Sequence, residues 1–210
     1  MNTKRLAILG AGGHGRVVAD AALLAGWNEI HFFDAAWPQR KENSHWPIVG
    51  NSQSLIDQLE QYEGVIVAIG DNQIRWEEHT KLVNKNAKLV SIIHPSAQLS
   101  PYAAIGCGTV VLAKAVINID AKIGDACIVN TGSTIDHDCI VEHAVHVCPG
   151  VNVSGGVSVG FGVWIGVGVS IKQGVSIGRK SMVGAGAVVI ADVLDCLTVV
   201  GNPAKQITYS

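Results

Sequence analysis

A six-residue period controls the second half of this chain. From Leu99 to Val189, every sixth residue is a branched aliphatic, with no insertion. An α-helix repeats about every 3.6 residues and a strand every second residue, so neither alone produces this period. It is typical of a parallel β-helix, in which short strands wind into triangular coils. The repeat comprises Leu99, Ile105, Val111, Ile117, Ile123, Val129, Ile135, Val141, Val147, Val153, Val159, Ile165, Ile171, Ile177, Val183 and Val189.

The period also predicts neighbours. Three hexads form one coil, so residues three hexads apart are expected to stack about 4.8 Å apart. Gly155 should therefore lie beside His137, with no side chain covering the imidazole from that coil. By the same spacing, Trp164 should lie beside His146. Glycine or asparagine often follows the repeated residue, as at Gly124, and we interpret these positions as glycine-tolerant corners.

The first part of the chain follows a different pattern, in which apolar strand-like runs alternate with helical ones. This alternation predicts a small Rossmann-like parallel sheet, so the expected fold class is an α/β domain over residues 1–92 followed by an all-β parallel β-helix over residues 93–210, with a closing segment at its end. The join is marked by His94-Pro95. The expected strands are 5–9, 30–33, 65–69 and 88–92, with helices at 16–25, 52–61 and 74–84 and a loop at 35–49.

Composition narrows the function classes. The formal net charge is −2 and no Lys/Arg cluster occurs, so we expect no nucleic-acid partner. No apolar run approaches the length that spans a membrane, so we expect no membrane insertion and a cytoplasmic protein. The five cysteines form no CxxC pair, which favours free thiols in a reducing compartment.

A glycine-rich turn links the first strand to the first helix. Gly10, Gly12 and Gly15 follow the dinucleotide spacing, and Asp34 ends the next strand. Such glycines let the backbone approach a phosphate at a helix N-terminus. Because only one mononucleotide half is present, the pattern favours a single nucleotide over NAD. Gly70, Asp71 and Asn72 end a strand at the same edge, although a structural turn explains Gly70 equally well.

The segment from Ile135 to Cys139 interrupts the apolar repeat with Asp136, His137 and Asp138. A neighbouring carboxylate stabilises a charged imidazole, so His137 is a candidate general base. The alternative is a solvated corner with polar decoration. A metal site is a further alternative, but a β-helix scatters this ligand-rich stretch over different faces, so no metal is expected. Its members are His137, Cys139, His143, His146 and Cys148.

Together, the nucleotide-type domain, the repeat carrying Ile-Asp-His-Asp-Cys and the Val-x-Gly-x-Pro-Ala-Lys ending at Val199–Lys205 resemble the NeuD/PglD family of sugar O- and N-acyltransferases. The resemblance covers essentially the whole chain. It implies a left-handed β-helix assembled as a homotrimer, with active sites between neighbouring prisms. It also implies acetyl-CoA as cosubstrate, and a UDP-4-amino-4,6-dideoxy-sugar as the acceptor in bacterial glycan synthesis.

The resemblance also implies residue roles. His137 matches the catalytic base and Asp138 its carboxylate partner. The positions matching the acceptor site are Asn130, Gly12, Gly13, His14 and Asp34, to which the strand end adds Gly70 and Asn72. The positions matching the acetyl-CoA site are His146, Ser154, Gly155, Ala185, Gly201 and Lys205. One departure is that Ala35, Ala36 and Trp37 stand where relatives can carry an acidic residue and a lysine.

The resulting hypothesis is direct transfer from acetyl-CoA to the sugar 4-amine. His137 removes the proton, and a backbone N–H of Gly155 or Gly156 binds the oxyanion. Three alternatives stay open at this stage: O-acetylation of a sialic acid-type sugar, a β-helix zinc hydratase, and a non-enzymatic nucleotide-binding partner protein.

Overall fold

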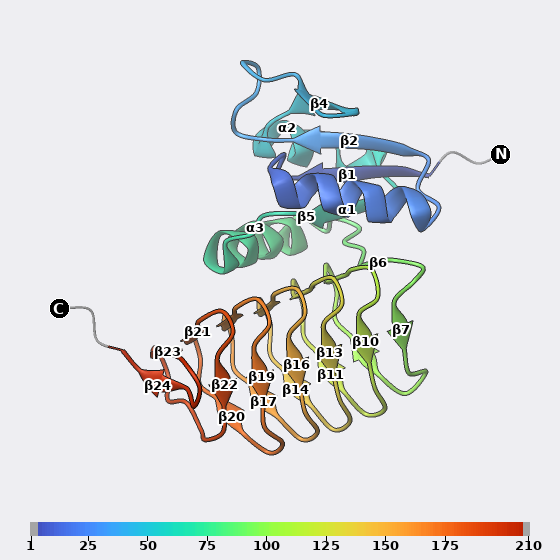
Figure 1. The fold of residues 1–210 in the computed structure, drawn as a ribbon. Helices are drawn as coiled ribbons and strands as arrows, with labels where there is room; N and C mark the ends of the chain where they lie inside the picture. The colour runs from blue at the N-terminus through green and yellow to red at the C-terminus, as the bar shows by residue number, and fades with distance from the viewer. Residues whose placement is uncertain (1–3, 208–210) are drawn as a thin grey trace.

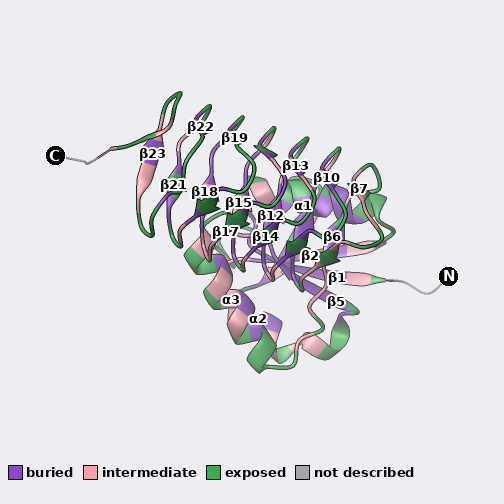
Figure 2. Cartoon of the chain, turned by 90° about the horizontal axis from the view of Figure 1, so that it is seen from below, coloured by how far each residue is buried: buried purple, intermediate pink, exposed green. Residues whose placement is uncertain are grey.

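The computed structural model describes residues 4–207 and shows an α/β layer stacked on a triangular coil, the prism (Figure 1). The polypeptide completes the α/β layer first and then winds into the prism, whose coils follow one another beneath that layer toward the C-terminus. Figure 2 shows that the strands of the α/β sheet are largely buried, whereas the outer turns of the prism are exposed. Among the described residues, no helix has the length and apolarity needed to cross a membrane.

The N-terminal sheet has five strands in the order β3-β4-β2-β1-β5, with β2, β1 and β5 running parallel. Its central strands are almost wholly apolar because helices and the prism cover them. The elements are β1 (Arg5–Leu9), α1 (Gly13–Leu24), β2 (Glu29–Phe33), β3 (Glu42–Asn43), β4 (Trp46–Gly50), α2 (Ser52–Asp57), the 3₁₀ turn η1 (Leu59–Gln61), β5 (Gly64–Val67) and α3 (Asn72–Asn84).

Three expectations for this domain need correction. Helix α1 begins at Gly13 rather than residue 16, because the glycine run itself forms the first turn behind an extended Gly12. The expected loop at 35–49 contains β3 and β4, and β4 adds a parallel strand to β2. The expected strand at 88–92 is not formed, since Leu89 makes only a single bridge to Val65.

Ile92 and Ile93 belong instead to the prism. They form β6 (Ile92–Ile93), which pairs with β9, so Ile93 sits opposite Val111. Ile93 lies one hexad before Leu99, which means that the repeat begins one step earlier than its regular run indicates. The domain boundary predicted between residues 92 and 93 falls inside this strand.

The prism has three faces of parallel strands, each strand stacked on the strand one coil earlier. The eight-stranded face contains β6, β9 (Val110–Val111), β12 (Ile128–Val129), β15 (His146–Val147), β18 (Trp164–Ile165), β21 (Met182–Val183), β23 (Thr198–Val200) and β24 (Lys205–Gln206). The six-stranded face contains β7 (Gln98–Leu99), β10 (Val116–Ile117), β13 (Thr134–Ile135), β16 (Asn152–Val153), β19 (Ser170–Ile171) and β22 (Val188–Val189). The five-stranded face contains β8 (Ala104–Ile105), β11 (Lys122–Ile123), β14 (Ile140–Val141), β17 (Ser158–Val159) and β20 (Ser176–Ile177).

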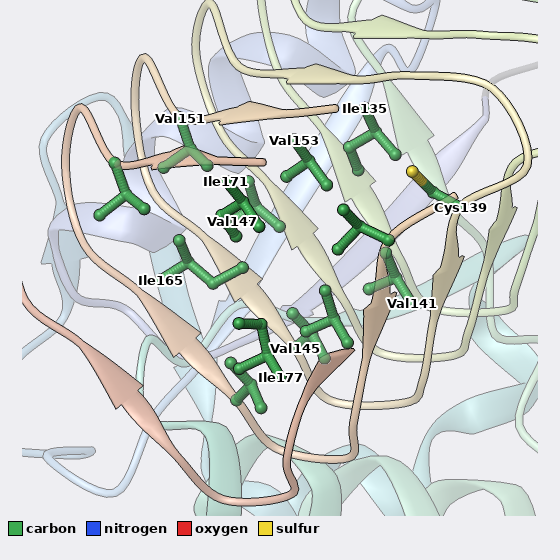
Figure 3. Close-up of a cluster of buried hydrophobic side chains, with 14 of the residues drawn as sticks. Ile135, Cys139, Val141, Val145, Val147, Val151, Val153, Ile165, Ile171 and Ile177 are labelled. Atoms are coloured by element: carbon green, nitrogen blue, oxygen red, sulfur yellow. The ribbon is translucent and has the colours of Figure 1, made fainter. Parts of the chain in front are cut away.

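The repeated aliphatic residue ends each two-residue strand from β7 to β22 and points into the coil (Figure 3). Small residues two positions earlier, such as Cys139 and Val145, fill the remaining interior. This packing removes branched side chains from water along the whole prism, and each such burial contributes about 1.5–3 kcal/mol. The predicted hexapeptide coil is therefore confirmed.

The corners differ in detail from the expectation. The backbone takes the left-handed conformation three residues after each repeated residue from Ile105 to Val183, not one residue after it. Glycine one residue after the repeated residue instead avoids a clash with the next coil. A Cβ at Gly124 would lie 2.7 Å from the backbone nitrogen of His143 there. The left-handed corner residues are Gly108, Lys114, Asp120, Ala126, Gly132, Asp138, Ala144, Gly150, Gly156, Gly162, Gly168, Gly174, Lys180 and Gly186.

The last coil is shorter than the others. Val199 pairs with Val183, and Val193 bridges to Ile177, both at a spacing two residues below the usual coil. The register therefore breaks before Asp195, where the sequence pattern ends. Strand β24 then folds back antiparallel on β23 and closes the end of the prism.

Candidate active site

His137 and Asp138 form an exposed hydrogen-bonded pair at the corner between the six- and five-stranded faces. Nδ1 of His137 lies 2.7 Å from Oδ2 of Asp138. Asp138 has φ of 58°, and this left-handed conformation is the one its corner position requires. The pair thus comes from adjacent residues because the tight corner bends one carboxylate back onto the preceding ring.

A second carboxylate, that of Asp136, binds the backbone of His137. Asp136 accepts the backbone N–H of His137 at 2.8 Å, and Nδ2 of Asn118, one coil earlier, donates to it at 2.8 Å. The hydrogen bond that the imidazole donates to Asp138, followed by the charge of Asp136, raises the pKa of His137 above its ordinary value. The imidazole is therefore suited to taking up a proton and holding it as a cation.

Gly155 lies beside His137, as the coil spacing predicts. A Cβ at Gly155 would lie 2.5 Å from both Cε1 and Nε2 of the imidazole. The ring therefore rests on the Gly155 backbone, and only glycine leaves room for it there. Cys139, two residues after His137, points into the coil and is buried, with its thiol donating to the Ser154 carbonyl at 3.2 Å.

The glycine-rich turn opens onto a cavity of about 870 Å³ in the N-terminal domain. It is lined by all four residues expected from the glycine-rich turn and the second strand, together with Gly70, which follows β5. The four are Gly12, Gly13, His14 and Asp34. Helix α1 has no acidic residue in its first turn and no side-chain cap, so its N-terminal N–H groups face the cavity unneutralised. This is the arrangement that binds phosphate groups.

Asp34 and Arg40 hold the glycine-rich turn from both sides. Oδ2 of Asp34 accepts the Ala11 N–H at 2.7 Å, and Nη1 of Arg40 donates to the Ala11 carbonyl at 2.8 Å. Arg40 also donates to Oδ1 of the buried Asn43 at 2.6 Å. Sequence reasoning missed Arg40 because β3 and β4 lay inside an expected loop, and it noted only that Ala35 and Ala36 replace polar residues.

His14 and His146 meet where the N-terminal domain contacts the eight-stranded face. Their ring centroids are 6.4 Å apart, and Nε2 of His146 lies 3.3 Å from Nδ2 of Asn130. Burial lowers the pKa of each imidazole to about 4, helped at His14 by the positive charges of His146 and Arg75 and at His146 by that of Arg75. Trp164 packs edge-on against His146 at 6.3 Å, as the coil spacing predicts.

Asn72 does not line the cavity with the glycine-rich turn. Its amide donates to the carbonyls of Gly162 and Val163 at 3.0 and 3.1 Å, so it joins α3 to the prism. A second cavity of about 480 Å³ lies there, and Gly70 is the residue that both cavities share. The second cavity includes side chains that sequence reasoning did not assign, namely Phe161, Trp164, Lys180 and Met182.

The residues expected at the acetyl-CoA site fall into two groups. His146 lies on the eight-stranded face, which continues through β21 and β23 to Lys205 on β24; Ala185 follows β21 and Gly201 follows β23. Ser154 and Gly155 instead lie at the corner of His137, between the other two faces. One chain therefore does not bring the two groups together.

The ligand-rich stretch of the repeat is also divided. Cys139 and Cys148 are buried, and His143 lies at another corner, where its Nδ1 accepts the Asp125 N–H at 2.8 Å. Within residues 4–207, no group of three or more His, Cys, Asp or Glu side chains is placed to hold a metal ion.

Known proteins match the whole architecture. The profile of the PglD N-terminal domain family matches residues 5–82. The acetyltransferase domain of PglB from Neisseria gonorrhoeae FA1090, solved in complex with acetyl coenzyme A, is 39% identical with a TM-score of 0.93, covering 98% of this chain and 100% of that one. PerB from Caulobacter crescentus, solved with CoA and GDP-perosamine, is 38% identical with a TM-score of 0.93, covering 99% of both chains.

WeeI from Acinetobacter baumannii AYE is more distant, at 25% identity and a TM-score of 0.89 over 98% of this chain and 100% of that one. These matches confirm the predicted fold class, including the left hand of the β-helix. The matched regions span both domains. The chain therefore belongs to the NeuD/PglD family of hexapeptide-repeat sugar acyltransferases.

Proposed function

We propose that the protein transfers the acetyl group of acetyl-CoA to the 4-amino group of a UDP-4-amino-4,6-dideoxy-sugar for glycan synthesis. The observation that carries the proposal is the His137–Asp138 pair, an imidazole of raised pKa exposed at a corner. An amine nucleophile must lose a proton as it attacks, and this pair accepts one. PglB and PerB, solved with acetyl-CoA and with CoA plus GDP-perosamine, support the same reaction class.

The reaction is written as a direct transfer. The 4-amine attacks the thioester carbonyl, so a C–N bond forms and, on collapse of the tetrahedral intermediate, the C–S bond breaks. His137 takes the proton from the nitrogen, and Asp138 stabilises the imidazolium before the proton passes to the departing CoA thiolate. Proton transfer of this kind contributes about 10²–10⁴-fold. No acyl-enzyme is required, since the Cys139 thiol faces the interior.

The hydrogen bonds of Gly155 and Gly156 favour one of them as the oxyanion donor. Gly156 donates its N–H to the carbonyl of His137 at 2.9 Å and is already engaged. The N–H of Gly155 makes no hydrogen bond within residues 4–207. We therefore assign the oxyanion contact to Gly155, whose backbone lies directly beneath the imidazole.

The complete site requires two copies of the chain. His137 lies at the corner opposite the eight-stranded face, whereas His146 lies on that face, and His14 and the nucleotide cavity belong to the N-terminal domain packed against it. In the proposed homotrimer, the His137 corner of one prism meets the His146 face of its neighbour. Acetyl-CoA would then run between prisms, with Ser154 and Gly155 from one and His146, Ala185, Gly201 and Lys205 from the other.

The proposal also specifies the nucleotide of the acceptor, which we take to be UDP. The two carboxylates that line the cavity already accept hydrogen bonds, Asp34 from backbone N–H groups and Glu78 from Ser52 and Lys81. Guanine presents several N–H donors that favour a free carboxylate, whereas uracil does not. GDP is the second candidate because PerB was solved with GDP-perosamine.

The test measures release of the CoA thiol with matched UDP- and GDP-linked 4-amino-4,6-dideoxyhexoses. We expect turnover with the UDP sugar and a much weaker response with the GDP sugar. The variant His137→Ala should lose at least about 10²-fold in kcat. Absence of turnover with every 4-amino nucleotide sugar would refute the proposed function, and preference for the GDP sugar would replace only the nucleotide.

A further inference from the structure

Helix α3 carries a fully buried arginine at the boundary between the two domains. Arg75 is 1% exposed, and its guanidinium reaches backbone carbonyls on both sides of that boundary. Nη1 donates to the carbonyls of Ile69 and Gly70, both at 3.0 Å, just after strand β5. Nε donates to the Ala126 carbonyl at 2.7 Å and Nη2 to the Ala144 carbonyl at 3.0 Å, both in the prism.

These prism carbonyls belong to successive coils. Ala126, Ala144 and Gly162 are left-handed corner residues spaced one coil apart. Arg75 binds the first two carbonyls, and Asn72, which donates to the Gly162 carbonyl, receives Nη2 of Arg75 on its Oδ1 at 2.8 Å. A pair of side chains on one helix thus spans three consecutive corners.

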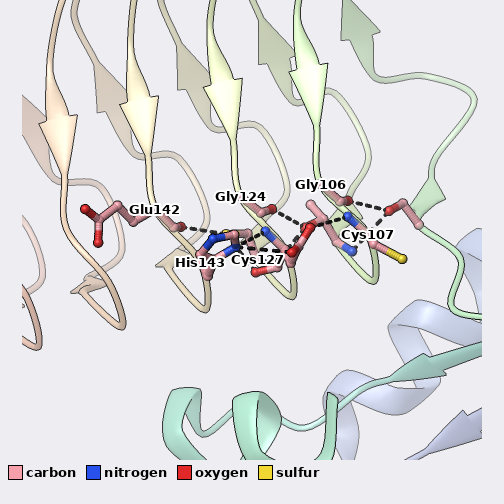
Figure 4. Close-up of polar contacts among 9 residues, drawn as sticks. Gly106, Cys107, Gly124, Cys127, Glu142 and His143 are labelled. Atoms are coloured by element: carbon pink, nitrogen blue, oxygen red, sulfur yellow. Dashed lines mark hydrogen bonds and ion pairs between the residues drawn. The ribbon is translucent and has the colours of Figure 1, made fainter. Parts of the chain in front are cut away.

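Hydrogen bonds between adjacent coils also stabilise the corner that Arg75 and Asn72 span. Figure 4 shows side-chain hydrogen bonds running along it from Glu142 and His143 to Cys107. Asp125 donates its N–H to Nδ1 of His143 at 2.8 Å and accepts the Cys107 N–H on Oδ1 at 2.7 Å. Because each bond joins adjacent coils, the carbonyls that Arg75 binds are held at fixed spacing.

The charge of Arg75 is not neutralised by a carboxylate in contact with it among the described residues. Its hydrogen-bond acceptors are carbonyls and one amide, and the titratable groups that interact with its charge are Asp71, Cys127, His79 and the His14–His146 pair. A buried cation acts strongly on neighbours because little water screens it. Its field opposes a positive charge on either imidazole.

We propose that Arg75 is a positioning residue that fixes the Ile69–Gly70 strand end, the wall shared by both cavities, against the prism. Its forked guanidinium (the fork), which donates to carbonyls of both domains at once, sets the distance between the nucleotide cavity and the eight-stranded face. Its charge adds to the burial that keeps His14 and His146 neutral, so that Nε2 of His146 can accept from Asn130. The kinetic consequence rests on the proposed acetyl transfer, but the titration consequence does not.

The test compares Arg75→Lys, which keeps the charge and loses the fork, with Arg75→Gln, which loses both. Arg179→Gln removes an exposed arginine of the prism and serves as the control. The histidine ring signals are followed by NMR in protein labelled at histidine Cε1, and KM and kcat are measured for both substrates. Thermal unfolding is recorded for every variant.

In the wild-type protein, His14 and His146 should titrate well below pH 6. In Arg75→Gln both midpoints should rise by about one pH unit, and in Arg75→Lys they should stay low. The nucleotide-sugar KM should rise about tenfold or more in both variants, because the cavity wall is displaced. Arg179→Gln should change neither quantity.

Several results would overturn the inference. Wild-type midpoints above pH 6 would do so without any variant. Equal upward movement of the midpoints in Arg75→Lys and Arg75→Gln would show that loosening, rather than charge, is responsible. A wild-type nucleotide-sugar KM in Arg75→Lys would refute the role of the fork. If the wild-type protein has no turnover, the proposed function fails, and the titrations still decide the role of Arg75.

Discussion

Acid should destabilise this protein through the His14–His146 pair. Burial and the Arg75 charge lower the pKa of each ring from 6.5 to about 4 in the folded chain. The unfolded chain binds protons at these histidines near pH 6.5, whereas the folded chain does so only near pH 4. Between those values the unfolded state holds more protons, so the free energy of unfolding falls as the pH falls from 6.5 to 4.

The magnitude follows from the two pKa values. For one group with pKa 6.5 unfolded and about 4 folded, lowering the pH from 7 to 5 costs about 2 kcal/mol of stability. The pair together should cost about 4 kcal/mol. Buried His79, whose pKa burial also lowers, adds a contribution of the same sign.

The assay is urea unfolding at pH 7 and pH 5, at one fixed protein concentration because assembly would couple to stability. The variant His14→Gln should lose about 2 kcal/mol less than the wild type between the two pH values. His45→Gln, which removes an exposed histidine, is the matched control and should behave as wild type. An equal pH dependence in wild type and His14→Gln would refute the assignment of a neutral, desolvated ring.

Three further outcomes are expected. In Asp138→Asn the acid limb of the kcat/KM profile should move to lower pH, because the hydrogen bond that raises the pKa of His137 weakens; an unmoved limb would contradict the pairing. Gly155→Ala should cut kcat by about 10²-fold or more with little change in thermal stability, since its Cβ displaces the imidazole. Cys139→Ser should keep kcat within about threefold in the thiol-release assay; a loss near that of His137→Ala would restore a covalent route.

The coil lattice was predictable from sequence because its register is covalently regular. One aliphatic residue per hexad, buried in every coil, leaves the strands a single alignment. The neighbours of His137 and His146 therefore followed from counting residues, and the structure confirms Gly155 and Trp164 at those positions. The glycine-rich turn and Asp34 were predictable for a similar reason, since both are local to one strand-turn-helix unit.

Contacts between the two domains could not be counted in this way. Arg75 reads in the sequence as a polar position of an ordinary surface helix, yet the structure buries it completely. Arg40 lay in an expected loop, and its role depends on how β3 and β4 return the chain to the glycine-rich turn. The Arg75 contacts depend on how the two domains dock, and those of Arg40 depend on the tertiary folding of the N-terminal domain. Neither the hexad period nor local propensity carries a signal for them.

The same regularity explains why the proposed site draws on two chains. A strict hexad repeat without insertions cannot raise a loop from one face over another, so a side chain reaches only its own face or corner. His137 is therefore confined to its corner, and His146 to the face that supports the nucleotide domain. Bringing a base and an acyl donor together then requires a second prism, whose flat faces are already shaped for stacking side by side. The lattice that makes each neighbour predictable is thus the physical reason for proposing a shared site.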